Sequence, residues 1–566
     1  MSLVSALNIG RSALAVHQAA IQVTSNNVAN AGNTDYTRQT PHIVPASEQL
    51  YKPGVFLGSG LNLDAVQRQI DESLQARIRT SISDSESAAS RQQWLSRVET
   101  IFHELGDDDL SSQLSTFFNS WSDLANKPQD IGLRQIVIQN GDSLAGSLRD
   151  MRTQLDGVST DMDKRLTTIA QDANSLADQV AYLNDQISTS EAGAGASANA
   201  LRDQRDAVLG QLSKLMDIKT QETGDGMVNV LVGSDPLVLG KTNRGVGFKI
   251  ESNGNELIPK LFIKADNGNL NVTSGTIGGL LGMRAEVGAV TDEVNSLAAN
   301  LIFELNKLHS SGQGLEGLSQ ITAGNAVADT TAVLNSSDTN LDFTPTNGSF
   351  VIHVKQKGTG LVTSTLVNID LDGLNNDDAT LDDLRASLDG INGISATISA
   401  GKLKIQSDSS DVEFSFSQDS SGVLAALGVN SFFKGTDAHD IAINTDLKTR
   451  PSLLSAAKNG QLGDNQAALA IAGLETTALK GLNGSTIREK YDSMINGIAV
   501  SSATSKTNAE AASTVQDTLL AQREALSGVS LDEEAVNLIR EQRAFQGAAR
   551  IISAIDELMK TILNMI

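Results

Sequence analysis

Residues 545–566 read FQGAARIISAIDELMKTILNMI and carry the clearest pattern in the chain. Their apolar side chains recur at alternating spacings of three and four residues, which is the a/d pattern of a coiled-coil helix. The positions, which we call the C-terminal seam, are Phe545, Ala548, Ile552, Ile555, Met559, Ile562 and Ile566. The pattern predicts a helix that packs lengthwise against another helix.

The N-terminal segment is the expected partner, because residues 3–28 also show helical periodicity. Two apolar stripes run along this segment, so the helix should contact more than one neighbour. They consist of Leu7, Leu14, Ile21 and Val28, and of Ala6, Ile9, Ala13, Val16, Ala20 and Val23. Because one seam is too small to order a helix by itself, we expect both termini to be partly disordered in the free chain and to fold on assembly.

The chain between these ends alternates between helical and strand-rich blocks. Two long stretches lack proline, which permits long helices there; they are residues 129–235 and 452–566. Periodicity predicts helix over 64–218, 276–310 and 464–566, with breaks at 106–109, 126–130, 188–200 and 526–531. Residues 36–63 look extended, and alternating apolar residues between turn residues predict strands over 225–272 and 342–418.

These blocks predict a mainly α protein with β insertions, in which the N- and C-terminal helices pair as a coiled coil. We expect a long helical bundle domain and outer strand-rich domains beside that pair. The predicted division is a terminal coiled-coil domain of residues 1–60 and 515–566, a helical rod-like domain of 61–320 and 450–514 with a small β part at 225–272, and an outer β-rich insertion of 325–448.

Composition excludes several classes of function. The chain of 566 residues has a formal net charge of −24 and no cysteine. Phosphate backbones repel such an acidic chain, which argues against general nucleic-acid binding. Without cysteine there are no disulfides, thiolate metal sites or cysteine nucleophiles. The apolar runs fall short of the roughly 18 residues needed to cross a bilayer, and the first residues lack a Sec-type signal pattern.

Three segments look like ligand-binding motifs, but each is better explained as a loop. GQGLEG at 312–317 matches G-x-G-x-x-G yet follows a predicted helix instead of a strand. DPLVLGKT at 235–242 has an acidic residue where a P-loop needs glycine. DLDGLNNDDATL at 370–381 lacks the glycine and the glutamate of an EF-hand loop. The histidines are scattered, and His17 lies between the seam residues of the first helix, so we expect no catalytic residue, cofactor or metal.

Two terminal segments resemble a known family. SNNVANAGNTDYTRQ at 25–39 is similar to the N-terminal signature of the bacterial flagellar axial proteins, which include rod, hook and hook-associated proteins. The matching residues are Asn26, Asn27, Ala29, Asn30, Thr34, Tyr36, Arg38 and Gln39, whereas AGNTDY departs from the usual ANTPGY. Residues 527–566 resemble the closing helix of the same family. LRDQRDAVLGQL at 201–212 resembles the hook-associated members, and 380–391 with its flanking strands resembles a module of flagellins and the filament cap.

The resemblance implies a structural role without catalysis. It implies an adaptor ring that joins the flagellar hook to the filament, with the terminal helices in the inner layer of a tube. The implied partners are further copies of the chain, hook protein, the second hook–filament junction protein, and a cytoplasmic export chaperone at the C-terminal helix. The implied location is the extracellular flagellum, reached through the flagellar type III exporter without a cleaved signal peptide, and neither nucleic-acid binding nor membrane insertion is expected.

The residues predicted to take part in assembly come from both termini. They are Leu7, Leu14, Ile21, Val28, Asn26, Asn27, Asn30, Tyr36, Arg38, Phe545, Ile552, Ile555, Met559 and Ile562. Two alternatives stay open at this stage. One is a hook or rod protein of the same family, and the other is a surface adhesin that uses the β insertion to bind ligands.

Overall fold

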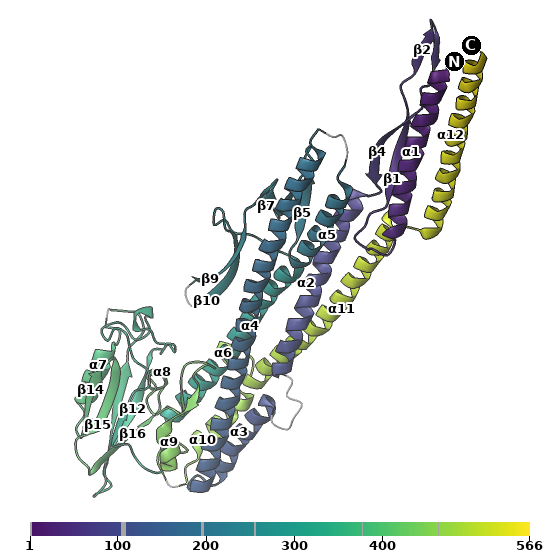
Figure 1. Cartoon of the computed structure of the whole chain (residues 1–566). Coiled ribbons are helices and arrows are strands. Elements are labelled where there is room, and N and C mark those ends of the chain that lie inside the picture. The colour runs from purple at the N-terminus through teal and green to yellow at the C-terminus, as the bar shows by residue number, and fades with distance from the viewer. Residues whose placement is uncertain are drawn as a thin grey trace. The chain divides into compact units, whose positions relative to one another are not determined.

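The computed structural model describes residues 3–102, 109–193, 197–253, 256–375, 377–461 and 463–565. The fold class is mainly α with strand-rich insertions, as predicted (Figure 1). The chain forms two compact units: residues 1–94, 161–284 and 503–566 make up the first, and 95–160 with 285–502 the second. The predicted division into three domains is finer than these units and stays a prediction. No helix among the described residues is long and apolar enough to span a membrane.

The first unit brings the two ends of the chain together. Helix α1 (Leu3–Ala29) and helix α12 (Leu531–Met565) lie side by side and antiparallel, so that both termini meet at one end of the pair (Figure 1). Strands β1 (Gln39–Pro45) and β4 (Leu61–Arg68) form an antiparallel hairpin that also contacts α1. The predicted pairing of the termini is thus present as a packed helix pair, whereas supercoiling as a coiled coil stays a prediction.

Long helices and short antiparallel strands complete this unit. The hairpin β2 (Gln49–Lys52) and β3 (Val55–Leu57) extends from β1 and β4. Helix α5 spans Asn199–Leu215, and four long helices belong partly to each unit: α2 (Glu72–Phe102), α4 (Ile131–Glu191), α6 (Gly275–Ser310) and α11 (Ile487–Ser527). One sheet has the order β5 (Ile218–Glu222), β6 (Val228–Val232), β7 (Asp235–Leu239) and β8 (Thr242–Asn243), and β9 (Val246–Asn253) pairs with β10 (Glu256–Ile263).

The second unit combines helices with two small three-stranded sheets. One sheet has the order β13 (Val362–Ile369), β12 (Gly348–Gln356) and β16 (Val412–Ser417), and the other has β11 (Gln320–Thr322), β15 (Lys402–Ser407) and β14 (Ile394–Ser399). Helix α7 (Leu381–Asp389) follows the first two strands, as the module resemblance predicted, and Thr380 and Asp383 form a capping box at its start. The remaining elements are α3 (Leu110–Asn126), α8 (Val423–Leu427), β17 (Phe433–Lys434), β18 (Ala442–Ile443), α9 (Thr445–Thr449) and α10 (Gln466–Ala472).

An aromatic cluster lies in the core of the second unit. Trp121 of α3 packs against Phe432 with tilted rings whose centroids are 5.5 Å apart, and the centroids of Phe432 and Phe433 are 4.8 Å apart. His309 of α6 lies beside both Trp121 and Phe432 and is fully buried. Its ring is hydrogen-bonded at both nitrogens, to the carbonyl of Asn430 and to the amide of Ser455.

Several boundaries differ from the sequence prediction. The helix expected from residue 64 begins at Glu72, because β4 pairs with β1 as far as Arg68. The helix expected from residue 464 is wrong as a continuous element: α10 ends at Ala472, 3-10 turns follow, and α11 begins at Ile487. Strands also begin earlier than residue 225, since β5 starts at Ile218. Residues 235–242 form the expected hairpin, whereas 106–108 lie outside the described residues.

Candidate assembly interface

Gly10 of α1 lies directly against Ile552 of α12. A Cβ atom on this residue would lie 2.9 Å from Cγ1 of Ile552, so a larger residue would force the Ile552 side chain to shift. Ala20, a small member of the second α1 stripe, is fully buried. Gly10 belongs to neither predicted stripe, so sequence periodicity did not identify it.

The C-terminal seam is buried only in part. Ala548 and Ile555 are 4% and 6% exposed, and they form the centre of the contact with α1. Phe545, Ile552 and Met559 are half-buried, whereas Ile562 is 46% exposed. Ile566, the last seam position, lies outside the described residues. The seam therefore packs along its middle and opens toward the end of the helix.

The two stripes of α1 have different surroundings. Val16 of the second stripe is buried. Near it, Ser12 accepts a hydrogen bond from the Leu61 amide of β4 at 3.3 Å, so the second neighbour of α1 within the chain is the β1–β4 hairpin. On the first stripe the leucines and isoleucine are half-buried and Val28 is 39% exposed; these residues are Leu7, Leu14, Ile21 and Val28. Contacts of this stripe with neighbouring subunits stay a prediction.

Two polar pairs join α1 to α12 in the half of the contact farther from the chain ends. Nδ1 of His17 lies 2.7 Å from Oε2 of Glu541. Nδ2 of Asn27 donates to Oε2 of Glu534 at 3.0 Å. Both glutamates are buried, and neither was predicted as a site residue. They could have been found, because 534, 541, 548 and 555 continue the heptad of the seam toward the start of α12.

The loop after α1 reinforces the pair at Glu534. The Asn27 side chain also donates to the Gln39 carbonyl at 2.9 Å and accepts from the Tyr36 hydroxyl at 2.7 Å. Arg38 reaches Glu534 through Nε at 2.9 Å and Nη2 at 2.7 Å. Burial, together with the carboxylates of Asp203 and Glu534, raises the pKa of Tyr36 to about 12, so the hydroxyl stays a donor at neutral pH.

The other predicted loop residues have local roles. Nδ2 of Asn30 donates to the carbonyl of Asn26 at 2.9 Å, and the same carbonyl accepts the Asn30 amide at 3.1 Å at the end of α1. Asn26 itself is exposed and lies within 3.4 Å of the Tyr36 hydroxyl. The Arg38 amide donates to the Ser527 carbonyl at 3.0 Å, and this bond joins the loop to the end of α11. The structure thus gathers the predicted loop residues around the start of α12.

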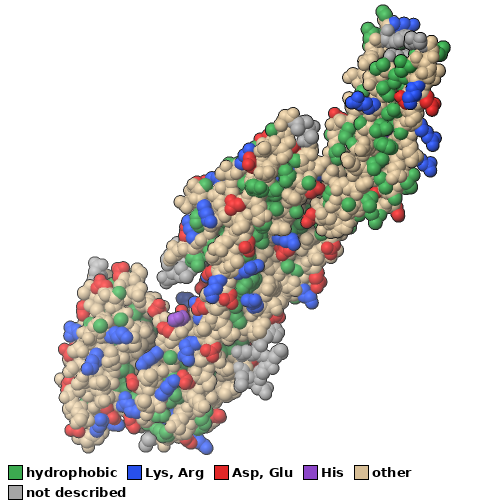
Figure 2. All heavy atoms as spheres, in the orientation of Figure 1, with side chains coloured by type: hydrophobic (Ala, Val, Ile, Leu, Met, Phe, Trp, Pro, Cys, Tyr) green, Lys and Arg blue, Asp and Glu red, His purple; other side chains and the backbone are tan. Residues whose placement is uncertain are grey.

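A second apolar stripe on α12 remains uncovered within the chain. Ile551, Leu558 and Met565 recur every seven residues and are 51%, 54% and 81% exposed. With Ala544, Ala548, Ile555 and Ile562 they form another series with spacings of three and four. Figure 2 shows hydrophobic side chains along the α1–α12 pair. The sequence prediction did not include this stripe, because the two series share Ala548, Ile555 and Ile562 and overlap on one helix.

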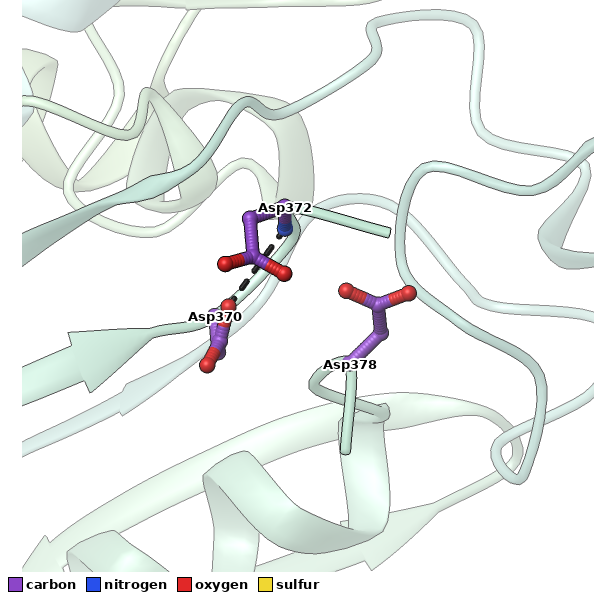
Figure 3. Close-up of side chains that lie close together, drawn as sticks. All are labelled: Asp370, Asp372 and Asp378. Atoms are coloured by element: carbon purple, nitrogen blue, oxygen red, sulfur yellow. Dashed lines mark hydrogen bonds between the residues drawn. The ribbon is translucent and has the colours of Figure 1, made fainter. Parts of the chain in front are cut away.

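Among the described residues of the second unit, one group of three carboxylates could hold a cation. Asp370, Asp372 and Asp378 lie in the loop between β13 and α7, with one oxygen of each within 4.8 Å of the others (Figure 3). Their oxygens already accept backbone N–H groups of the loop, from Asp372, Leu374 and Gly373. The loop agrees with the prediction of a solvated acidic turn, and the expectation of no metal stays a prediction.

The chain is similar to flagellar proteins along its whole length. Residues 95–326 match the family described as the flagellar hook-associated protein FlgK helical domain, and 522–565 match the C-terminal family of flagellar basal body rod FlgEFG proteins. Flagellar hook-associated protein 1 of Salmonella typhimurium is 26% identical over 99% of this chain and 100% of its own length. The protein of that name from Bacillus subtilis is 25% identical over 99% of this chain and 97% of its own.

A solved structure shares the fold. The flagellar hook junction protein FlgK from Burkholderia pseudomallei aligns with a TM-score of 0.51 and 15% identity, over 80% of this chain and 100% of the other. The matches to an internal helical domain and to the C-terminal segment, with the full-length relatives, indicate a structural protein of the bacterial flagellum, not an enzyme. Along nearly its whole length the chain is similar to flagellar hook-associated protein 1.

Proposed function

We propose that this chain forms the junction between the flagellar hook and the filament. It is a structural component of the flagellum that associates with hook and flagellar components. In the finer proposal, copies of the chain assemble into a ring whose neighbours are hook protein on one side and the second junction protein on the other. The observation that carries the proposal is the uncovered apolar stripe of α12, at Ile551, Leu558 and Met565.

An exposed apolar stripe beside a packed helix pair suits contact with further copies. Large apolar patches on the surface of soluble chains mark interaction sites. When such a patch binds a different surface of the next copy, the contact produces a ring or a tube instead of a closed dimer. Val4 of α1 and Leu563 of α12 are exposed at the same end of the pair and enlarge the apolar area. These residues support an inner position for the helix pair in the assembly.

The apolar residues of the C-terminal helix, which include those of the seam, support an earlier partner in the cytoplasm. We propose that an export chaperone covers the C-terminal helix before the chain leaves through the flagellar type III exporter, since an amphipathic helix fits a partner's groove. Charged substitutions at Ile552 and Ile555 should abolish recovery of the chain with its chaperone. Retained recovery would contradict this part of the proposal.

An in-frame deletion in the source bacterium tests the junction role. We expect normal hooks, no filaments, and flagellin shed into the medium as monomer, measured by electron microscopy and by blotting. Loss of the hook as well would indicate a hook or rod protein instead. Intact motile filaments would contradict the junction role and favour the adhesin alternative.

A pair of surface variants tests the stripe itself. Leu558→Asp places a charge on the exposed stripe, and Val515→Asp on α11 is a matched control, because both side chains are 54% exposed. We expect Leu558→Asp to prevent filament assembly while the control allows it, with equal amounts of exported chain in the medium. Equal filament numbers in the two strains would show that the stripe is not the contact between copies.

A further inference from the structure

We infer that the polar pairs His17–Glu541 and Asn27–Glu534 determine the register in which α12 meets α1, so that Glu534 and Glu541 act as specificity-determining residues. Both pairs are short, at 2.7 Å and 3.0 Å, and both glutamates are buried in the contact. The inference concerns pairing within one chain, and it does not depend on contacts between copies.

Apolar packing alone does not select the face of α12. The helix carries two overlapping apolar series, and in its C-terminal half either could line a contact with the small residues of α1. Both series include Ala548, so Glu541 and Glu534, which lie one and two heptads before it, continue either series. The polar pairs therefore do not select the face of α12, and their role concerns the register.

Apolar packing does not fix the register either. Gly10 lies against Ile552, and a slip of α12 by one heptad would bring Met559 to the same place. This slip would leave His17 opposite Ala548, and the opposite slip would bury Glu541 among Gly10 and Ala13. A buried charged or polar group without its partner is strongly unfavourable, and single buried polar residues are known to set register in helix pairs.

The pair at Glu534 has a fixed position because the loop holds it. Asn27 is bound by Tyr36 and Gln39, and Arg38 contacts Glu534 and Glu533. The Arg38 amide in turn is bonded to Ser527 at the end of α11. One end of α12 is thus tied to a defined point beside α1. Two turns further along α12, the His17–Glu541 pair is a second polar contact that forms only in this register.

Engineered disulfides measure the register, because the chain has no cysteine of its own. One turn on from Gly10 and Ile552, antiparallel packing places Ala13 opposite Ala548. Ala13→Cys with Ala548→Cys reports the native register, and Ala13→Cys with Ile555→Cys reports a slip of one heptad. In dilute full-length chain equilibrated in a glutathione buffer, the fraction of each disulfide reports how often its two positions meet.

We expect the native disulfide to dominate at least tenfold in the unsubstituted chain. In the variant His17→Leu/Glu541→Leu, we expect the ratio of native to slipped disulfide to fall at least tenfold. The matched control is His42→Leu/Asp64→Leu, which removes an exposed His–Asp pair on the β1–β4 hairpin and should leave the ratio unchanged. The variant His17→Glu/Glu541→Lys restores an opposite-charge pair and should restore the native ratio.

Three results would overturn the inference. The first is equal fractions of both disulfides in the unsubstituted chain, which would show that no register is selected. The second is an unchanged ratio in the leucine variant. The third is loss of both disulfides in that variant, which would mean that the pair is needed for the helices to meet at all and not for their register.

Discussion

The α1–α12 pair and the aromatic core of the second unit bury apolar side chains in opposite ways. Around Trp121, Phe432 and His309, every ring is enclosed by the unit's own elements. On α12, Ile555 is buried while Leu558, three residues later, is 54% exposed. The core is complete within the chain, whereas the helix pair leaves an apolar stripe exposed. The two regions should therefore respond differently to the same kind of substitution.

The largest loss of folding stability is expected from a substitution in the aromatic core. Phe432→Ala removes a fully buried ring and should lower the free energy of unfolding of the second unit by about 4 kcal/mol. Leu366→Ala, on the exposed face of β13, is the control and should change it by less than about 0.5 kcal/mol. Denaturant titrations of both variants measure the difference. Similar values would mean that the cluster is not the core of this unit.

In the α1–α12 pair, the largest loss of stability is expected when the buried polar residue Glu534 is replaced. Glu534→Ala leaves Arg38 and Asn27 without their buried acceptor and should cost about 3 kcal/mol of helix-pair stability. Glu533→Ala removes the exposed partner of the same arginine, 62% exposed, and should cost less than about 1 kcal/mol. Hydrogen exchange of residues 531–541 distinguishes the two variants, and equal protection would show that Glu534 is not the anchor of α12.

The stability of the second unit should also depend on pH, because His309 in its aromatic core is buried. Burial lowers the pKa of His309 to about 4, below its ordinary value of about 6.5. Because the unfolded chain binds the proton more readily, stability is full above pH 6.5 and falls as the pH drops toward 4. Between pH 7 and 5 the loss should be about 2 kcal/mol from this group.

Variants assign this pH dependence to one histidine. His309→Gln should remove it, and His439→Gln, an exposed histidine of the same unit, should retain it. Thermal unfolding of the second unit at pH 7 and pH 5 is the measurement. An undiminished loss in His309→Gln would assign the effect to other groups.

The smallest effect on the isolated chain is expected on the exposed stripe. Leu558→Ala should change the stability of the helix pair by less than about 0.5 kcal/mol, whereas Ile555→Ala should cost about 2 kcal/mol. Circular dichroism during thermal unfolding of the full chain compares them. A large effect of Leu558→Ala would show that the stripe is already covered within the chain.

Periodicity of the apolar residues was enough to predict the helices at both ends of the chain and most helices and strands between them. Repeating apolar residues locate α1 and α12 because a helix places residues three and four apart on one face. Alternating residues located β12 to β16 for the corresponding reason in strands. The prediction failed at 473–486, where the structure has 3-10 turns. This segment, GLETTALKGLNGST, contains three glycines, which disfavour a continuous helix.

Only the tertiary structure decided which of these residues meet. His17 and Glu541 are 524 positions apart, and Asn27 and Glu534 are 507 apart, so neither pair leaves a local signature. The sequence showed a seam of apolar residues, but burial depends on which face another helix covers. The structure covers Ile555 and leaves Leu558 exposed because α1 reaches only one side of α12.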